Sequence, residues 1–259
     1  MNMREIDITR GIVENHVESL YRALESDVVI VGGGPSGLVA GGYLAQKGFN
    51  ITILEKRLSP GGGIWGGGMG YKYVIIQEEA KGVLDDFGIP CRSYRDNYFC
   101  VDSINFASGL IFEATKRGVN IFNLTECEDL LVRDGRVTGV VVNSSLVQHA
   151  HLPVDPITFE AKAVVDATGH DHDVVRTFSN KNDVKLNTPT GKPMGERSMF
   201  AETAEQAVVT NTKEVYPGLF VCGMSTAAVY GGFRMGPIFG GMLLSGKKLA
   251  GLLEECCSR

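Results

Sequence analysis

Hydrophobic residues recur at two different periods along this chain, and the two periods predict helices alternating with strands. Apolar residues at every third or fourth position predict an amphipathic helix over residues 9–24. A β-branched run at 27–31 ends in glycines, a helical segment follows over 35–47, and a second apolar run occupies 51–55. Together these segments predict a βαβ unit with a right-handed crossover.

The rest of the chain extends this pattern into an α/β fold. We expect three more helices and three more core strands, over residues 77–87, 103–117 and 240–254 and over residues 119–124, 159–167 and 219–222, respectively. Two alternating stretches over 128–142 surround Asp134-Gly135, which predicts an inserted β-hairpin or small antiparallel sheet. Glycine-rich residues 60–70 and polar residues 179–198 are expected to be loops. We interpret residues 1–259 as one α/β domain built on a parallel sheet.

Composition narrows the class of protein. The 259 residues are 44% hydrophobic and 21% charged, with a formal net charge of −5. Because no cluster of Lys or Arg interrupts this acidic balance, neither nucleic acid nor an anionic membrane is the expected partner. No apolar run reaches the roughly 18 residues of a membrane span. The charged N-terminal segment and six cysteines without a CxxC pair favour a cytoplasmic protein with reduced thiols.

The most specific motif follows the first predicted strand. Gly32, Gly34 and Gly37 occupy the three glycine positions of G-x-G-x-x-G, between a predicted strand and a predicted helix. The first glycine permits the turn, the second lets a pyrophosphate approach the backbone, and the third lets the helix pack on the strand. Glu55 ends the second strand, where an acid would bind a ribose diol and disfavour a 2′-phosphate. The motif therefore predicts binding of NAD or FAD.

Several segments occur in the order typical of the glutathione-reductase-like, two-dinucleotide-binding flavoproteins, which they resemble: 55–57, 60–63, 128–142, 166–169 and 217–223. This resemblance implies a Rossmann-type parallel sheet. Flavin-binding members usually carry an aspartate after the glycine that corresponds to Gly223, and this chain has Met224. A methionine cannot accept hydrogen bonds as a carboxylate does. The substitution favours another adenine dinucleotide, and an FAD-dependent oxidoreductase remains the alternative.

Histidines concentrate in one region and provide candidate metal ligands. Four of the five, His149, His151, His170 and His172, lie between residues 143 and 172, together with Asp155. A carboxylate and an imidazole suit ferrous iron, manganese or zinc. By residue type alone, an aspartate before a proline also forms turns, and a histidine after a glycine is often exposed. Metal binding and ordinary loop positions both remain open on these grounds.

A closer resemblance rests on a combination of motifs. The chain resembles the thiamine thiazole synthase family, most closely its archaeal branch, from about residue 10 to 250. The segments that carry the resemblance are Gly32–Gly37, Glu55-Lys56, the loop Pro60–Met69 with its sequence PGGGIWGGGM, Val154-Asp155-Pro156, Thr168–Asp171, and Gly231–Pro237 with its sequence GGFRMGP. The resemblance implies a transferase that uses NAD as a substrate, condenses its ADP-ribose part with glycine, and adds sulfur to form an adenylated thiazole carboxylate.

The same resemblance implies roles for individual residues. Positions that bind the ADP part correspond to Ser36, Glu55, Lys56 and Gly63, and further dinucleotide contacts correspond to Cys127 and Met224. Asp155 and His170 correspond to the ligands of a ferrous ion, contributed by neighbouring subunits of a ring-shaped octamer. Arg234 corresponds to the residue that pairs with the carboxylate of glycine, a role that suits a bidentate guanidinium.

The expected sulfur source follows from one position. Eukaryotic members donate sulfur from a cysteine two residues before the position of Asp155, where this chain has Pro153, and residues 128–221 contain no cysteine. We therefore expect free sulfide as the sulfur source and multiple turnovers, with the ferrous ion as template and Lewis acid. His151 is a further catalytic candidate, two residues before Pro153, and its role stays open.

Overall fold

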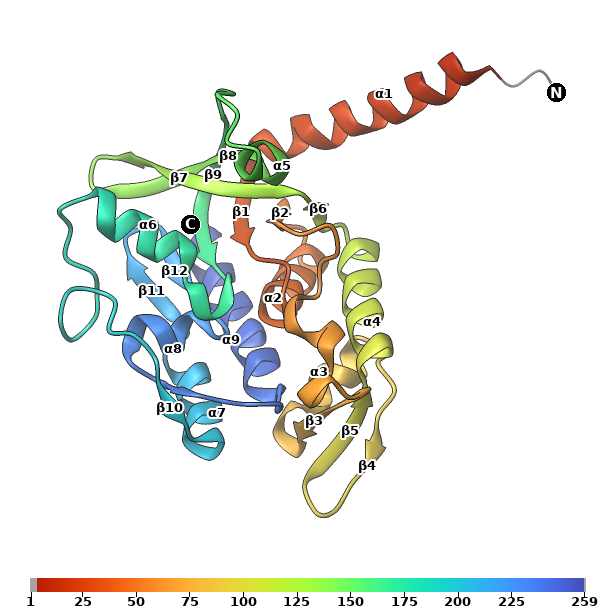
Figure 1. Ribbon diagram of the computed structural model, residues 1–259, viewed down its shortest axis with the longest axis vertical. Coiled ribbons are helices and arrows are strands. Elements are labelled where there is room, and N and C mark those ends of the chain that lie inside the picture. Colours follow the sequence, from red (N-terminus) through yellow and green to blue (C-terminus); the bar gives the residue numbers. More distant parts are fainter. Residues whose placement is uncertain (1–3, 259) are drawn as a thin grey trace.

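The computed structural model describes residues 4–258 (Figure 1). Its helices are α1 Glu5–Leu24, α2 Pro35–Gln46, α3 Lys81–Asp86, α4 Ser103–Lys116, α5 Ser145–His149, α6 Asp173–Lys181, α7 Ala201–Thr210, α8 Ser225–Tyr230 and α9 Gly240–Cys257. Its strands are β1 Glu25–Val31, β2 Ile51–Leu54, β3 Tyr73–Gln77, β4 Arg92–Ser93, β5 Tyr98–Asp102, β6 Asn120–Phe122, β7 Thr125–Arg133, β8 Arg136–Ser144, β9 Ile157–Asp166, β10 Arg197–Met199, β11 Lys213–Tyr216, β12 Leu219–Val221 and β13 Phe233–Arg234. Short 3-10 turns lie at Gly62–Gly66, Gly68–Gly70, Glu78–Ala80 and Gly169–Asp171.

The central sheet is parallel along its middle and has the order β11-β12-β9-β1-β2-β6. Strands β12, β9, β1, β2 and β6 run parallel, and β11 pairs antiparallel with β12. The hairpin β7-β8 joins this sheet through an antiparallel pairing of β8 with β9. Asp134 and Gly135 at its tip have φ of 49° and 73°, as a type I′ turn requires. The predicted α/β fold with an inserted hairpin is confirmed.

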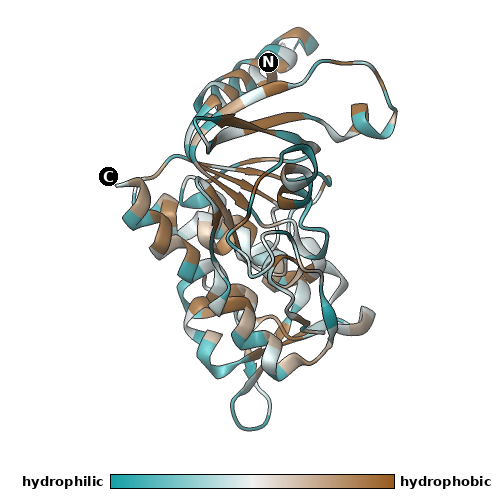
Figure 2. Cartoon of the chain, turned by 90° about the vertical axis from the view of Figure 1, so that its left-hand side faces the viewer, coloured by the Kyte–Doolittle hydropathy of each residue, from teal (hydrophilic) through white to brown (hydrophobic). Residues whose placement is uncertain are grey.

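Side chains alternate between the two faces of the sheet, and each face carries its own layer. Val28 and Ile30 of β1 pack in one cluster with α2, α4 and α9, whereas Val29 and Val31 pack in the other with α6 and the hairpin. Figure 2 shows the hydrophobic strands at the centre of the molecule. Because both faces are covered, β2, β12 and the second half of β1 are apolar at nearly every position, which is the pattern that predicted them.

The structure corrects the prediction for residues 60–102. The helix expected over 77–87 is shorter, because β3 occupies Tyr73–Gln77 and α3 begins at Lys81. Strand β3 pairs with β5, and β5 pairs with β4, forming a second, antiparallel sheet that the sequence did not predict. The loop expected over 179–198 also contains the end of α6 and the start of β10.

Helix α1 extends away from the body of the molecule (Figure 1). Its C-terminal end packs on the sheet through Ala23, but much of its apolar side is uncovered: Ile6, Ile8, Ile12, Val13, Val17 and Tyr21 are all exposed. The amphipathic pattern that predicted this helix therefore has no covering surface over most of its length within residues 4–258. Among the helices described here, none combines the length and apolar character needed to cross a membrane.

Candidate functional site

A pocket of about 360 Å³ opens at the carboxyl ends of the central strands. Val31 at the end of β1, Leu54 at the end of β2 and Ala167 just after β9 all line it. Ligands of open α/β sheets bind outside the carboxyl ends of the strands, so this is the expected position of a dinucleotide. All nine residues predicted to bind the dinucleotide contribute to its wall or to the turn beside it: Gly32, Gly34, Ser36, Gly37, Glu55, Lys56, Gly63, Cys127 and Met224.

The three motif glycines have three different reasons to lack a side chain. Gly32 has φ of 110°, and a Cβ there would lie 2.3 Å from the carbonyl oxygen of Ala167. A Cβ at Gly37 would lie 2.3 Å from the carbonyl oxygen of Gly32, so this glycine allows α2 to approach β1. A Cβ at Gly34 would meet nothing within 4 Å and would enter the pocket. Gly34 therefore leaves room for a ligand group at the N-terminus of α2, where free N–H groups favour a phosphate.

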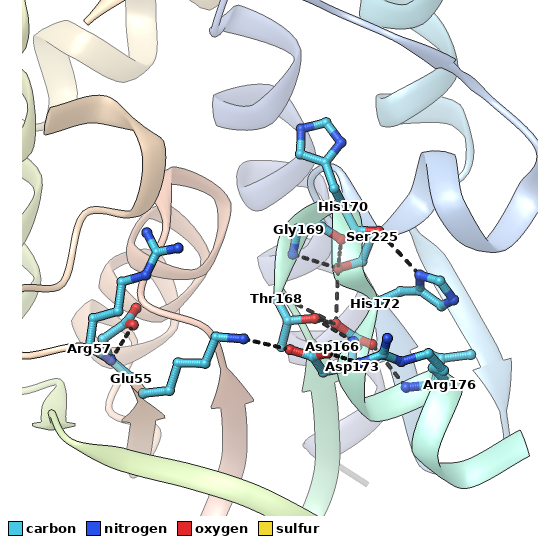
Figure 3. Close-up of polar contacts among 12 residues, drawn as sticks. Glu55, Arg57, Asp166, Thr168, Gly169, His170, His172, Asp173, Arg176 and Ser225 are labelled. Atoms are coloured by element: carbon cyan, nitrogen blue, oxygen red, sulfur yellow. Dashed lines mark hydrogen bonds and ion pairs between the residues drawn. The ribbon is translucent and has the colours of Figure 1, made fainter. Parts of the chain in front are cut away.

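The carboxylate of Glu55 is buried beside this turn, with only 6% of the residue exposed. Its Oε2 accepts a hydrogen bond of 3.1 Å from the backbone N–H of Gly33, and its Oε1 accepts one of 2.8 Å from the N–H of Arg57. Figure 3 shows Glu55 and Arg57 together on one side of the site. These bonds fix the carboxylate at the pocket wall with lone pairs left to accept from a ribose diol.

Lys56 reaches across the pocket from the end of β2 to α6. Its Nζ lies 2.9 Å from Oδ2 of Asp173, and both residues line the pocket. Burial alone would lower the pKa of Lys56, but the hydrogen bond and charge of Asp173, with the nearby carboxylates of Asp171 and Glu126, raise it above its usual value. The ammonium group is therefore charged throughout the physiological range and can face a phosphate.

A buried carboxylate, Asp166, fixes the turn that carries His170. Oδ1 of Asp166 accepts from the backbone N–H of Thr168 at 3.0 Å and from the hydroxyl of Ser225 at 2.9 Å, and Oδ2 accepts from the N–H of Val175 at 2.9 Å. The Ser225 oxygen in turn accepts from the N–H of Gly169 at 3.0 Å. Figure 3 shows this network beneath Gly169. It ties the end of β9, the 3-10 turn and the start of α6 and α8 into one rigid unit.

His170 projects from this turn into the pocket wall and contacts Glu196. Its Nδ1 lies 2.6 Å from Oε1 of Glu196. Because a carboxylate offers no hydrogen, Nδ1 of His170 must be the donor. A neutral His170 then has its free lone pair on Nε2, the atom available to a metal ion. The other carboxylate oxygen, Oε2, lies 3.8 Å from Nε of Arg234, so the predicted metal ligand and the predicted glycine-binding residue share one carboxylate.

Cys127 lines the pocket but is an unreactive thiol. Burial, together with the negative charge of Asp166, raises its pKa to about 12. Its S–H donates to the backbone carbonyl of Asp129 at 3.3 Å. Since the thiolate is the nucleophilic form of cysteine, this residue is a neutral wall of the pocket at physiological pH.

Asp155 and His151 lie outside the pocket. Both occupy the exposed segment before β9, whereas His170 follows the end of β9, and neither Asp155 nor His151 lines the pocket. The ten residues of β9 span roughly 30 Å at about 3.3 Å per residue. The two predicted iron ligands therefore lie at opposite ends of this strand. Within residues 4–258, no three side chains of His, Cys, Asp or Glu come together as a metal site.

Sequence reasoning missed two residues of this site. Asp173 follows a His-Asp-His run and was visible as one of several acidic neighbours of His170, so its position directly after the turn was the available signal. Glu196 lies 26 residues after His170 in a segment of mixed polar residues and carries no local signal. The pairing of β10 with β13, together with backbone hydrogen bonds beside it, brings Glu196 next to Arg234.

Comparisons with known proteins agree with this geometry. The chain matches the Thi4 family over residues 9–239. It is 49% identical to a thiamine thiazole synthase of Methanothermobacter thermautotrophicus, covering 98% of this chain and 99% of that protein, and 49% identical to one of Pyrococcus horikoshii, covering 96% of each. The crystal structure of Thermovibrio ammonificans THI4 covers all of both chains with a TM-score of 0.98 at 44% identity. The chain therefore belongs to the Thi4 family.

Proposed function

We propose that this protein is a thiamine thiazole synthase that converts NAD, glycine and free sulfide into an adenylated thiazole carboxylate. The proposal rests above all on one observation. A pocket built for a dinucleotide carries at its wall a histidine whose Nδ1 is held by a carboxylate and whose Nε2 is free. Family membership over nearly the full length supports the same activity.

The chain's own residues divide the substrate binding between them. The open position at Gly34 and the N-terminus of α2 receive the pyrophosphate, with Ser36 beside it. Glu55 accepts from the ribose hydroxyls, and the charged Lys56 faces a phosphate. Arg234, whose Nε lies 3.8 Å from Oε2 of Glu196, is proposed to bind the carboxylate of glycine, because a guanidinium can pair with a carboxylate in a bidentate fashion.

We propose ferrous iron as the metal, with His170 as one ligand and Asp155 of a second copy as the other. The donor set fits such an ion, because a fixed imidazole and a carboxylate leave positions open for substrate atoms. Asp155 lies at the far end of β9 from His170 in the same chain, so a second copy must supply it. When bound, the ion supplies Lewis-acid chemistry and a template for the incoming sulfide.

We also propose that the functional form is a homo-oligomer, with a ring-shaped octamer as the expected assembly. The uncovered apolar side of α1 supports this, since exposed apolar patches of this kind mark interaction surfaces. Leu152 and Val154, exposed in the same segment as Asp155, support a subunit contact at that loop. One symmetric assembly can contain both proposed contacts, the active site shared between subunits and the packing of a second subunit against α1.

Sulfide, rather than a protein thiol, is the proposed sulfur source. Pro153 occupies the position that corresponds, by the family resemblance, to the donor cysteine of eukaryotic members. Burial raises the pKa of Cys127, the cysteine in the pocket wall, to about 12, so its thiol is neutral and is not a suitable sulfur donor. The enzyme would then complete many turnovers without loss of sulfur from the chain. We place it in the cytoplasm, where thiols and ferrous iron stay reduced.

Anaerobic reconstitution tests the whole proposal. Purified protein is incubated with NAD, glycine, sulfide and ferrous iron, and the products are separated and identified by mass spectrometry. Free nicotinamide together with an adenylated thiazole carboxylate, in excess over protein, is the expected result. Nicotinamide release without a thiazole, from folded and iron-loaded protein, would count against synthase activity. A flavin absorption spectrum of the purified protein would instead favour an FAD-dependent oxidoreductase.

A further inference from the structure

Glu196 lies between two residues that the proposed function uses for different purposes. Its Oε1 lies 2.6 Å from Nδ1 of His170, and its Oε2 lies 3.8 Å from Nε of Arg234. The Glu196 side chain is only 16% exposed, whereas those of His170 and Arg234 are 48% and 55% exposed. The carboxylate is therefore the most enclosed member of the three, and each of its oxygens faces a different partner.

The backbone on both sides of Glu196 is fixed to the segment that carries Arg234. The N–H of Gly195 donates to the carbonyl of Ala228 at 2.9 Å, and the N–H of Arg197 donates to the carbonyl of Gly232 at 2.8 Å. Strand β10 then pairs with β13, where Met199 lies opposite Arg234. Glu196 and Arg234 consequently move as one unit, so the long contact between them is set by the fold.

The contact with His170 joins this unit to a second one. His170 belongs to the turn that Asp166 and Ser225 hold rigid, so its backbone is fixed independently of Glu196. Its ring, however, is half exposed and has Glu196 as its side-chain partner on Nδ1. Rotation of the imidazole is therefore restrained mainly by this one short hydrogen bond.

We infer that Glu196 is a positioning residue that sets the ring of His170 and the guanidinium of Arg234 at a fixed separation. By accepting from Nδ1, it selects the tautomer of His170 in which Nε2 carries a free lone pair. It also orients Nε2 toward the proposed metal ion. Through the charge of Oε2, 3.8 Å from Nε, it attracts the guanidinium of Arg234, which would bind a carboxylate through its other nitrogens. This inference rests on the proposed function, because it assigns Glu196 a role toward the proposed metal and glycine.

An ordinary surface ion pair is the competing explanation. Pairs of exposed charges contribute little, typically about 0–1 kcal/mol, and their loss changes stability slightly and nothing else. The enclosed carboxylate and the short contact to an imidazole nitrogen point instead to orientation of a metal ligand, whose loss typically costs about 10- to 100-fold in metal affinity. Metal affinity therefore separates the two explanations.

The experiment compares the variants E196A and E196Q with wild type and with E202A. Glu202 is an exposed carboxylate on the neighbouring helix α7, so E202A makes the same change of charge away from the site. Co(II) alone is titrated into each oligomeric protein and followed by calorimetry and by the absorption of the bound ion. Melting temperature and size-exclusion chromatography establish that each variant is folded and assembled.

We expect E196A to bind Co(II) about 10- to 100-fold more weakly than wild type, and E202A to match wild type. E196Q should lose less affinity than E196A, because its amide oxygen can still accept from Nδ1 of His170. In steady-state assays, both Glu196 variants should raise the KM for glycine about two- to fivefold, the range of a lost exposed ion pair. If Glu196 had a structural role alone, its variants would have a lower melting temperature, but their Co(II) affinities would not decrease in the order wild type, E196Q, E196A.

Two results would overturn the inference. Wild-type Co(II) affinity in folded E196A, or in E196L should E196A fail to fold, would show that Glu196 does not orient His170, because neither side chain can accept from Nδ1. An unchanged KM for glycine in both variants would remove the role toward Arg234. If the wild-type protein binds no Co(II), the proposed metal site is wrong, and so is the role of Glu196 toward it. This outcome differs from equal Co(II) affinities in all the proteins, which would contradict only the role of Glu196.

Discussion

Replacing two motif glycines by alanine should give opposite results, although the chemical change is the same. At Gly37 a new Cβ would lie 2.3 Å from the carbonyl oxygen of Gly32, a backbone atom that cannot rotate away. Helix α2 must then shift from β1. Overpacking of this kind costs up to about 3 kcal/mol, of which the better helix propensity of alanine recovers about 1 kcal/mol. We therefore expect Gly37→Ala to lose about 2 kcal/mol, or about 4–8 °C in Tm.

At Gly34 the backbone is extended, with φ of −78° and ψ of −178°, and a Cβ would meet nothing within 4 Å. A poorer helix cap and a less flexible unfolded chain change the stability in opposite directions, each by less than about 1 kcal/mol. Gly34→Ala should therefore keep the wild-type Tm. Its methyl group would enter the space proposed for the pyrophosphate, so affinity for ADP-ribose should fall about tenfold or more, about 1.4 kcal/mol.

Differential scanning calorimetry and isothermal titration with ADP-ribose measure both quantities on the same preparations. The expected pattern is a low Tm for Gly37→Ala and weak binding with a normal Tm for Gly34→Ala. Undiminished ADP-ribose affinity in Gly34→Ala would refute the placement of the pyrophosphate at this glycine. A normal Tm in Gly37→Ala would refute the reasoning on helix packing.

Four further outcomes are expected. Oligomers assembled at random from equal amounts of D155A and H170A chains should regain about one quarter of wild-type activity, because a competent site needs an intact Asp155 from one chain and an intact His170 from another. No recovery of activity would contradict a site shared between chains. C127A should keep sulfide-dependent turnover, and Cys127 of the wild type should resist alkylation until the pH approaches its pKa of about 12. Lys56→Met should weaken ADP-ribose binding. In the wild type this contribution should persist to higher pH than that of an ordinary lysine, because the pKa of Lys56 is raised. Ile12→Glu should shift native mass spectra toward smaller assemblies.

The sequence predicted those parts of the fold whose signals are local. The βαβ unit, the hairpin and the pocket residues from Gly32 to Gly63 all follow from a motif or a run of apolar residues within a short stretch. The sheet of β3, β4 and β5 was missed because Tyr73–Gln77 and Tyr98–Asp102 are short and meet only across an intervening helix. Their pairing depends on long-range packing, which periodicity does not record.

The site shows the same division. Glu55 and His170 could be predicted because each follows a recognisable strand or turn. Glu196 could not, because its contacts depend on the pairing of two very short strands. The helix over 9–24 was predicted as amphipathic, but the sequence could not tell that most of the apolar side of α1 would face away from its own chain.

Strand β9 has a consequence for how mutations would act. In the proposed assembly its ten residues are a rigid spacer, with Asp155 serving one reaction centre and His170 another. A mutation in the loop that carries Asp155 would then inactivate the reaction centre of a neighbouring subunit. The centre that contains His170 of the mutated chain would remain active. A polypeptide damaged at both ends of the strand would inactivate two centres, its own and a neighbour's. The loss of activity in a mixed assembly would then exceed the share of damaged chains.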